Sequence, residues 1–152
     1  MPIGEHVILL TVTTDLNEKS TAQVTITIKV PSIALNKAFL VSASEAGLGN
    51  LPQNAIDGNL ATRWSSPYSD PQWYQIDLGK RYDIKKVVLI WEVASAKDYR
   101  IEESNDAVNW TTVVQKTNMA NGARTDVFDN LKGGSRYIRF YGTARTTTWG
   151  YS

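Results

Sequence analysis

The chain has 152 residues, which is enough for one well-packed domain and a short appendage. Sixteen Lys and Arg stand against 15 Asp and Glu, and no block of like charge occurs, so we expect neither nucleic acid nor an anionic membrane as a partner. The absence of Cys and the presence of one His exclude disulfides, thiolate metal sites and multi-histidine metal sites, and leave few enzyme classes open.

Two segments near the N-terminus alternate β-branched and polar residues with a period of two, which is the pattern of β-strands. They are residues 5–13 and 22–30, and Pro31 ends the second because it cannot donate a backbone hydrogen bond. A lone hairpin is marginally stable in water and needs a further element to pack against. The sequence therefore predicts a hairpin over residues 1–31, followed by a domain over residues 32–152.

The domain over residues 32–152 contains short strand patterns separated by turns, without a convincing amphipathic helix. The predicted strands are residues 38–42, 72–79, 84–91, 99–104, 110–115, 125–128 and 135–142. The run 84–91 is rich in apolar residues, which favours a strand buried on both faces. This organisation predicts an all-β sandwich or barrel.

A loop over residues 54–66 combines turn formers with a carboxylate, a hydroxyl, a guanidinium and an indole. Gly58 tolerates a positive φ, and the side chains of Asp57 and Asn59 can bond back to the local backbone. The loop is therefore expected to be tight and self-bonded. Because loops that a rigid β scaffold positions often carry binding residues, this stretch is the first candidate for a site.

Several motifs follow the order and approximate spacing of one known family. They are Ala34-Leu35-Asn36-Lys37-Ala38, Ala55-Ile56-Asp57-Gly58-Asn59 with Thr62-Arg63-Trp64, Trp73-Tyr74-Gln75-Ile76-Asp77-Leu78-Gly79, Tyr99-Arg100-Ile101 with Ser104-Asn105-Asp106 and Asn109-Trp110, Arg136-Tyr137-Ile138-Arg139 and Trp149-Gly150-Tyr151-Ser152. On these residues the chain from Asn36 to Ser152 resembles a discoidin, or coagulation-factor C-type, domain of the carbohydrate-binding module family 32 type. The resemblance implies a discoidin-like jelly-roll β-sandwich, ligand loops clustered at one end, and no catalysis of its own.

The N-terminal hairpin resembles the closing strands of a bacterial immunoglobulin-like or polycystic-kidney-disease-like domain. The residues that carry this second resemblance are the alternating positions from Gly4 through Val12 and the following Asp15. It implies that residues 1–31 are the tail of a preceding module, or a cover for a sheet edge of the following one.

The family resemblance implies a calcium site in the 54–66 loop. Asp57, Asn59 and Thr62 match the loop that holds one calcium ion in the family, through side-chain and main-chain oxygens. Calcium takes about 6–8 oxygen ligands, so a single carboxylate supplemented by carbonyls indicates a structural site rather than a switch. The alternative is an empty, self-bonded turn.

A sugar site requires an aromatic face against the apolar face of a pyranose, with polar groups that reach its hydroxyls. The resemblance to glycan-binding members places their ligand loops at Glu45, around Arg63 to Tyr68, and at Trp149. We expect Trp149 and Tyr68 to stack on the sugar and Arg63 to donate hydrogen bonds. Glu45 would supply a charged acceptor, which matters most for an amino sugar.

Each of these side chains also has a structural explanation. Arg63 suits a brace against Asp57 or Asp70, and Glu45 suits a solvated loop charge. Core packing is favoured for the tryptophans in strand patterns or family core positions, which are Trp64, Trp73, Trp91 and Trp110. A second candidate rim comprises Glu92, Lys97 and Tyr99.

These observations predict a non-catalytic carbohydrate-binding module that attaches a larger secreted protein to a polysaccharide outside the cell or at its surface. The alternative is a structural or protein-interaction module. Family members continue past the motif at Ser152 into a closing strand, so we expect an open sheet edge that the hairpin or another chain covers by strand pairing. An enzyme is the weakest hypothesis, because Glu92, Glu102 and Glu103 show no paired geometry.

Overall fold

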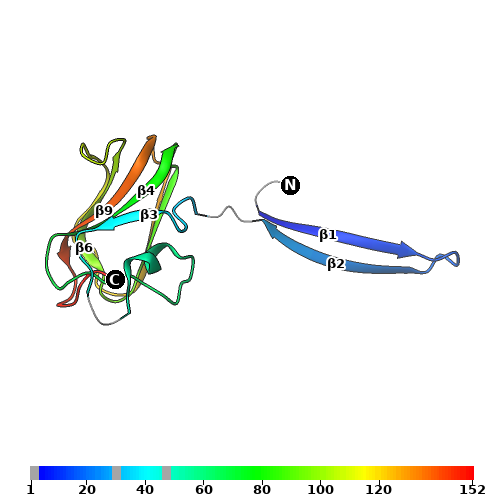
Figure 1. The fold of residues 1–152 in the computed structure, drawn as a ribbon. Coiled ribbons are helices and arrows are strands. Elements are labelled where there is room, and N and C mark those ends of the chain that lie inside the picture. Colours follow the sequence, from blue (N-terminus) through cyan, green and yellow to red (C-terminus); the bar gives the residue numbers. More distant parts are fainter. Residues whose placement is uncertain (1–3, 29–31, 46–48) are drawn as a thin grey trace. The chain divides into compact units, whose positions relative to one another are not determined.

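The computed structural model of the protein describes residues 4–28, 32–45 and 49–152. The chain folds as two compact units, Met1–Ser32 and Ile33–Ser152 (Figure 1). Within the described residues, no helix is long and apolar enough to cross a membrane.

The N-terminal unit is the predicted β-hairpin. Strand β1 (Gly4–Thr13) pairs antiparallel with β2 (Lys19–Ile28) along its whole length. Asn17 adopts φ 60° in the connecting turn, where the Thr14 backbone N–H donates to the Glu18 carbonyl at 2.9 Å. Apolar side chains such as Val12 remain exposed on the hairpin, in keeping with the marginal stability of a two-stranded ribbon.

The second unit contains a five-stranded antiparallel sheet and a smaller two-stranded sheet. The larger sheet has the order β3-β4-β9-β6-β7, with β3 at Ala38–Val41, β4 at Gln72–Tyr82, β9 at Ser135–Arg145, β6 at Ala96–Ser104 and β7 at Thr111–Lys116. The smaller sheet pairs β5 (Lys86–Trp91) with β8 (Arg124–Asp129). A short 3₁₀ turn, η1 (Pro52–Ile56), precedes the Asp57 loop.

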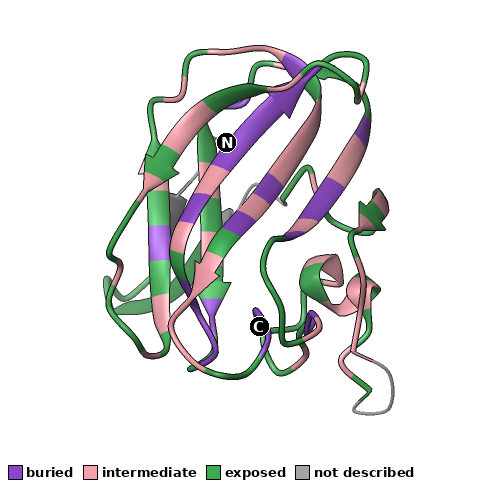
Figure 2. Cartoon of the chain, turned by 90° about the vertical axis from the view of Figure 1, so that its left-hand side faces the viewer, coloured by how far each residue is buried: buried purple, intermediate pink, exposed green. Residues whose placement is uncertain are grey.

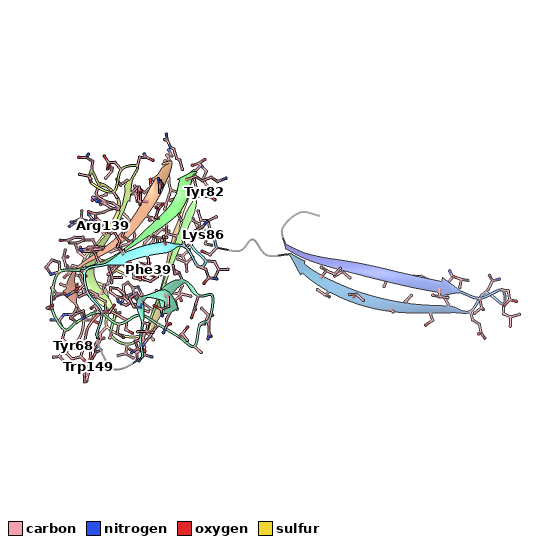
Figure 3. All side chains as sticks on the ribbon, in the orientation of Figure 1. Phe39, Tyr68, Tyr82, Lys86, Arg139 and Trp149 are labelled. Atoms are coloured by element: carbon pink, nitrogen blue, oxygen red, sulfur yellow. The ribbon has the colours of Figure 1, made fainter. Side chains whose placement is uncertain are left out.

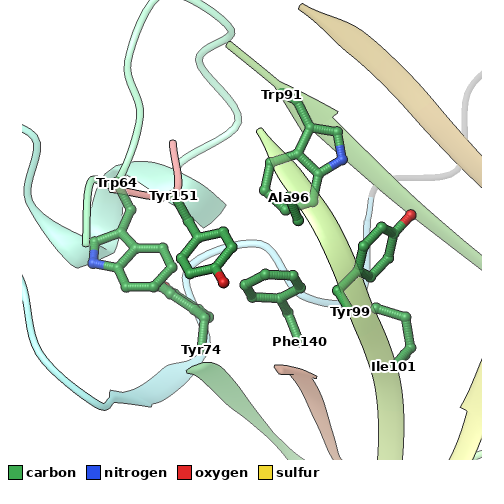
Figure 4. Packing of buried hydrophobic residues seen from close by; sticks show 8 residues of the cluster. All are labelled: Trp64, Tyr74, Trp91, Ala96, Tyr99, Ile101, Phe140 and Tyr151. Atoms are coloured by element: carbon green, nitrogen blue, oxygen red, sulfur yellow. The ribbon is translucent and has the colours of Figure 1, made fainter. Parts of the chain in front are cut away.

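Aromatic side chains join the two sheets. Trp91 of β5 packs its ring 5.2 Å from that of Phe140 on β9 and 5.8 Å from that of Tyr99 on β6. Figure 4 shows the buried cluster, which consists of Trp64, Tyr74, Trp91, Ala96, Tyr99, Ile101, Phe140 and Tyr151. The all-β sandwich predicted from the sequence is therefore confirmed.

Successive side chains of a strand point to opposite faces of the sheet. Burial is not strictly alternating, because both faces of β6 are covered from Ile101 to Ser104, as the long buried stretch in Figure 2 shows. On β9, Phe140 faces the core and is 8% exposed, whereas its neighbour Tyr141 points to the outer face. We call the face that carries Tyr141 the outer face of the five-stranded sheet. It also carries Trp73, which lies opposite Tyr141 in the β4–β9 register.

Two predictions about burial are wrong. Strand β5 is not buried on both faces, since Val88 is 43% and Ile90 58% exposed on the side away from the core. Of the tryptophans expected in the core, Trp64 and Trp91 are buried, but Trp73 and Trp110 are only half-buried. Apolar or aromatic composition indicates a strand, but the packing of one sheet on the other determines which face of that strand is exposed to solvent.

Candidate functional site

Three of the side chains predicted to bind a ligand lie together at one end of the sandwich. The rings of Tyr68 and Trp149 meet edge to face, with centroids 5.4 Å apart at 89°. The Tyr68 hydroxyl donates to the Glu45 carboxylate, and this hydrogen bond raises the pKa of Tyr68. Trp149 is 60% exposed and Tyr68 45%, so both aromatic surfaces are open to a ligand (Figure 3).

The loops that carry these residues are held together by backbone pairing. The Ser66 N–H donates to the Tyr151 carbonyl at 2.9 Å, and the Ser66 hydroxyl accepts from the Tyr151 N–H at 2.9 Å. Any side chain at Gly150 would overlap the Ser66 backbone. The Glu45 N–H donates to the Ser65 carbonyl at 3.0 Å, which brings the third loop alongside.

Arg145, at the end of β9, holds the loop that presents Trp149. Its guanidinium donates to the carbonyls of Thr148 and Trp149, both at 3.1 Å, and to the Asp70 carboxylate at 3.2 Å. Asp70 also accepts from the hydroxyl of Tyr151, whose pKa is raised by burial and then by this bond. The role of Arg145 could not be predicted from the sequence, because its partner Asp70 lies 75 residues away along the chain.

Arg63 is exposed, and its side chain makes no hydrogen bond or ion pair with the residues that the structure describes. The bracing alternative is not realised. Asp70 bonds to Arg145 and Tyr151, and Asp57 bonds within its own loop. Arg63 is thus available to a ligand, but it does not contact the three clustered side chains.

The Asp57 loop is the tight, self-bonded turn expected from the sequence. One Asp57 carboxylate oxygen accepts from the Asn59 N–H at 2.7 Å, and the other from the Thr62 hydroxyl at 2.7 Å. These bonds, the Asn59 one first, lower the pKa of Asp57. Gly58 supplies the positive φ of 81°, and the Thr62 hydroxyl also lies 2.8 Å from the Asn59 carbonyl.

Oxygen atoms of Asp57, Asn59 and Thr62 therefore converge, which suits the chemistry of calcium. The side-chain oxygen of Asn59 instead accepts from the Ala61 N–H, so Asn59 would offer its main-chain carbonyl. No group of three or more His, Cys, Asp and Glu side chains that could hold a metal occurs in the described part of the chain. A cation here would depend on one carboxylate and on neutral oxygens.

The second candidate rim does not form. Tyr99 is 2% exposed and donates to Asp126 inside the core, where burial raises its pKa. An open hollow lies elsewhere on the unit, where Figure 3 shows Tyr82 at the opposite end from Tyr68 and Trp149. It is lined by Arg81, Tyr82, Asp83, Lys85, Lys132, Gly133 and Gly134.

Comparison with solved structures shows two informative similarities. Chitosan-binding module 2 of a Paenibacillus sp. IK-5 chitosanase/glucanase, solved with chitotriose, is 42% identical, with a TM-score of 0.73; the match covers 79% of this chain and 93% of that one. The family 32 carbohydrate-binding module of AlyQ, solved with 4,5-unsaturated mannuronic acid, is 29% identical, with a TM-score of 0.64; the match covers 77% of this chain and 91% of that one.

A curated relative shows a similar segment within a much longer protein. The polysaccharide lyase 8 family protein HylA of Enterococcus faecalis is 29% identical over 89 residues, which are 58% of this chain and 6% of that protein. The family model of the F5/8 type C domain matches residues 40–152. The match includes strands β4 to β9 and the loops that bring Glu45, Tyr68 and Trp149 together. The chain therefore belongs to the F5/8 type C domain family.

Proposed function

We propose that this protein is a non-catalytic carbohydrate-binding module whose loop site, Glu45, Tyr68 and Trp149, holds an amino-sugar polysaccharide of the chitosan type. The observation that carries the proposal is the convergence of two exposed aromatic rings and one carboxylate on loops held by Ser66 and Arg145. Aromatic faces accept the apolar face of a pyranose, and a carboxylate complements a sugar ammonium group. The similarity to a module solved with chitotriose supports this choice of ligand.

Affinity is expected to be weak, on the order of 10 µM to 1 mM, because a shallow site with two aromatic contacts leaves little free energy after the costs of association. The module would hold a larger secreted protein, a polysaccharide-degrading enzyme or an adhesin, on its substrate outside the cell. Arg63, which is exposed and has no hydrogen-bond partner among the described residues, would add hydrogen bonds to the sugar.

The test is calorimetric titration of the wild type, Trp149→Ala and Glu45→Gln with chitotriose and with its fully N-acetylated analogue. Trp149→Ala should weaken binding of both sugars at least tenfold, since it removes the exposed stacking face. Glu45→Gln should weaken chitotriose selectively, because the N-acetylated analogue carries no ammonium group. Val108→Ala, which trims another exposed apolar side chain, is the control. Equal loss of both sugars in Glu45→Gln would contradict the amino-sugar assignment.

The Asp57 loop is proposed to hold one structural calcium ion through the Asp57 carboxylate, the Thr62 hydroxyl and the Asn59 carbonyl. The supporting observation is the convergence of these three oxygens at 2.7–2.8 Å. A cation that binds only the folded state raises the melting temperature as its concentration rises above its dissociation constant. Millimolar calcium should therefore raise the melting temperature of the wild type and leave Asp57→Asn unchanged, whereas an equal response of both proteins would refute the site.

Interaction through a sheet edge remains the second candidate function. The specific observation is the exposed apolar face of the small sheet, which carries Val88, Ile90 and Val127. Another chain could pair with the edge of β5 and place its own apolar side chains beside this face. Light scattering across a concentration series tests this: a monomer at all concentrations, with Val88→Lys as soluble and as stable as wild type, would remove the proposal.

A further inference from the structure

The outer face of the five-stranded sheet carries aromatic and arginine side chains in adjacent positions. In the strand register, Trp73 of β4 lies opposite Tyr141 of β9, and Tyr141 lies opposite Arg100 of β6. One pair further along, Gln75 lies opposite Arg139. We call these five residues, Trp73, Gln75, Arg100, Arg139 and Tyr141, the outer track.

The aromatic residues of this face differ from those of the core in how their polar atoms are used. In the core, the indole N–H of Trp91 donates to Asp126 at 2.8 Å, and the hydroxyl of Tyr74 donates to the Pro52 carbonyl at 2.8 Å. Neither the Trp73 indole nor the Tyr141 hydroxyl has a hydrogen-bond partner among the described residues. Their polar atoms are therefore available to a bound molecule.

Gln75 adds a polar side chain to the outer face. It is only 7% exposed, in the middle of the outer face, with Leu40 opposite on β3 and Arg139 opposite on β9. Its side-chain amide makes no hydrogen bond with any part of the chain that the structure describes. Its amide nitrogen and oxygen are not enclosed by protein, since neither is among the buried polar atoms of the described residues that lack a hydrogen-bond partner. They can therefore bond to a sugar hydroxyl on the sheet.

Each of the two arginines lies over an aromatic ring, and their charge is neutralised in part. The Arg100 guanidinium lies 4.1 Å from the centre of the Tyr141 ring, and that of Arg139 lies 4.0 Å from the centre of the Trp110 ring. Glu102, which lies opposite Arg139 in the register, accepts hydrogen bonds from both guanidinium groups. The outer track is thus a pre-ordered surface of ring and guanidinium planes without a strong net charge, which suits a weakly charged chain of sugar rings better than a polyanion.

The outer track continues towards the loop site. Tyr137, Arg139 and Tyr141 of β9 face outward, a span of about 13 Å at the rise of a β-strand, and Trp73 lies one residue from the start of β4, which follows the Tyr68 loop. Beyond a bulge in the β6–β9 register, Arg145 ends β9 and bonds to the carbonyls of Thr148 and Trp149. In Figure 3, Arg139 lies on the same side of the domain as Tyr68 and Trp149, further along the sheet.

We propose that the outer track is a second binding surface, on which a polysaccharide chain held at the loop site continues across the sheet. Trp73 stacks on a sugar ring, Gln75 bonds to a sugar hydroxyl, and the flat guanidinium of Arg100 donates to ring substituents. This inference rests on the proposed function. It adds that affinity rises with chain length beyond the few sugars that the loop site holds.

The experiment compares chitotriose with chitohexaose by calorimetry for the wild type, Trp73→Ala, Gln75→Ala, Trp149→Ala and the control Val108→Ala, which trims an exposed apolar side chain between β6 and β7. The wild type and the control should bind chitohexaose about tenfold more tightly than chitotriose. Trp73→Ala and Gln75→Ala should each reduce the preference for chitohexaose over chitotriose about fivefold and leave the affinity for chitotriose unchanged. Trp149→Ala should weaken binding of both sugars. Urea unfolding curves verify that each variant is folded.

The outcomes separate the two proposals. If the wild type binds chitotriose but shows no length preference, or if Trp73→Ala keeps that preference, the outer track is refuted and the loop site stands. If the wild type binds neither sugar, the proposed function fails and the outer track fails with it. Binding of a single-stranded oligonucleotide that Trp73→Ala abolishes, without binding of chitohexaose, would overturn the polysaccharide assignment.

Discussion

The two faces of the five-stranded sheet differ in whether the polar atoms of their tyrosines have hydrogen-bond partners. On the inner face, Tyr99 packs between Trp91 and Phe140, and its hydroxyl donates to Asp126. On the outer face, Tyr141 lies under Arg100, and its hydroxyl has no partner in the described chain. The inner face therefore uses aromatic rings for stability, whereas the outer face leaves their polar atoms available to a ligand.

Two neighbouring carboxylates on β6 also differ between the faces, but here the side chain on the outer face is the one with hydrogen-bond partners. Glu102 on the outer face is 4% exposed, but it bonds to Arg100 and Arg139. Glu103 on the inner side is 7% exposed, and one of its oxygens has no hydrogen-bond partner in the described residues. Burial raises the pKa of Glu103. The difference teaches that pairing, more than burial alone, decides whether a charge is tolerated in this sheet.

The largest expected effect on stability comes from truncating a core residue of β9, compared with truncating its neighbour on the outer face. Phe140→Ala should lower the free energy of unfolding by about 3–5 kcal/mol, because it leaves a cavity among Trp91, Tyr99 and Tyr151. Tyr141→Ala should cost about 1 kcal/mol, the scale of a partly exposed cation–π contact. Urea denaturation of both variants measures the comparison, and equal losses would contradict the distinction between the two faces.

A smaller effect is expected at the paired carboxylate. Glu102→Gln should lower the free energy of unfolding by about 2 kcal/mol, because hydrogen bonds to charged groups are lost and Arg139, 15% exposed, keeps its charge without a partner. Thermal unfolding near neutral pH measures it. A variant as stable as the wild type would show that the guanidinium groups need no counter-charge.

The smallest effect should have the opposite sign. Because the folded-state pKa of Glu103 is raised, its ionisation costs stability as the pH rises through the unfolded and then the folded pKa. Glu103→Gln should therefore stabilise the protein by about 1 kcal/mol at neutral pH, and this gain should shrink as the pH falls below the unfolded value. Melting temperatures of both proteins measured from pH 3 to 8 give the profile, and a gain that is constant with pH would count against it.

The candidate site was partly predictable from the sequence. Glu45, Tyr68 and Trp149 were predicted as ligand residues, and the structure brings them together. The residues that hold the site were not predicted, because Arg145 meets Asp70 and Ser66 meets Tyr151 across 75 and 85 residues. No local pattern encodes such contacts, since they arise when the two loops are brought alongside each other.

The sequence by itself determined the strands, the hairpin, the tight Asp57 turn and the family, because periodicity, turn residues and motif spacing are local properties. Only the tertiary structure decided which face of each strand meets solvent. Trp64 and Trp91 are buried, whereas Trp73 and Trp110 are half-buried. Trp110 packs against Arg139, and Trp73 lies opposite Tyr141, next to the pair formed by Gln75 and Arg139. The physical reason is that an indole suits a core and a binding surface equally well, so sheet layering, set by long-range pairing, assigns each one its role.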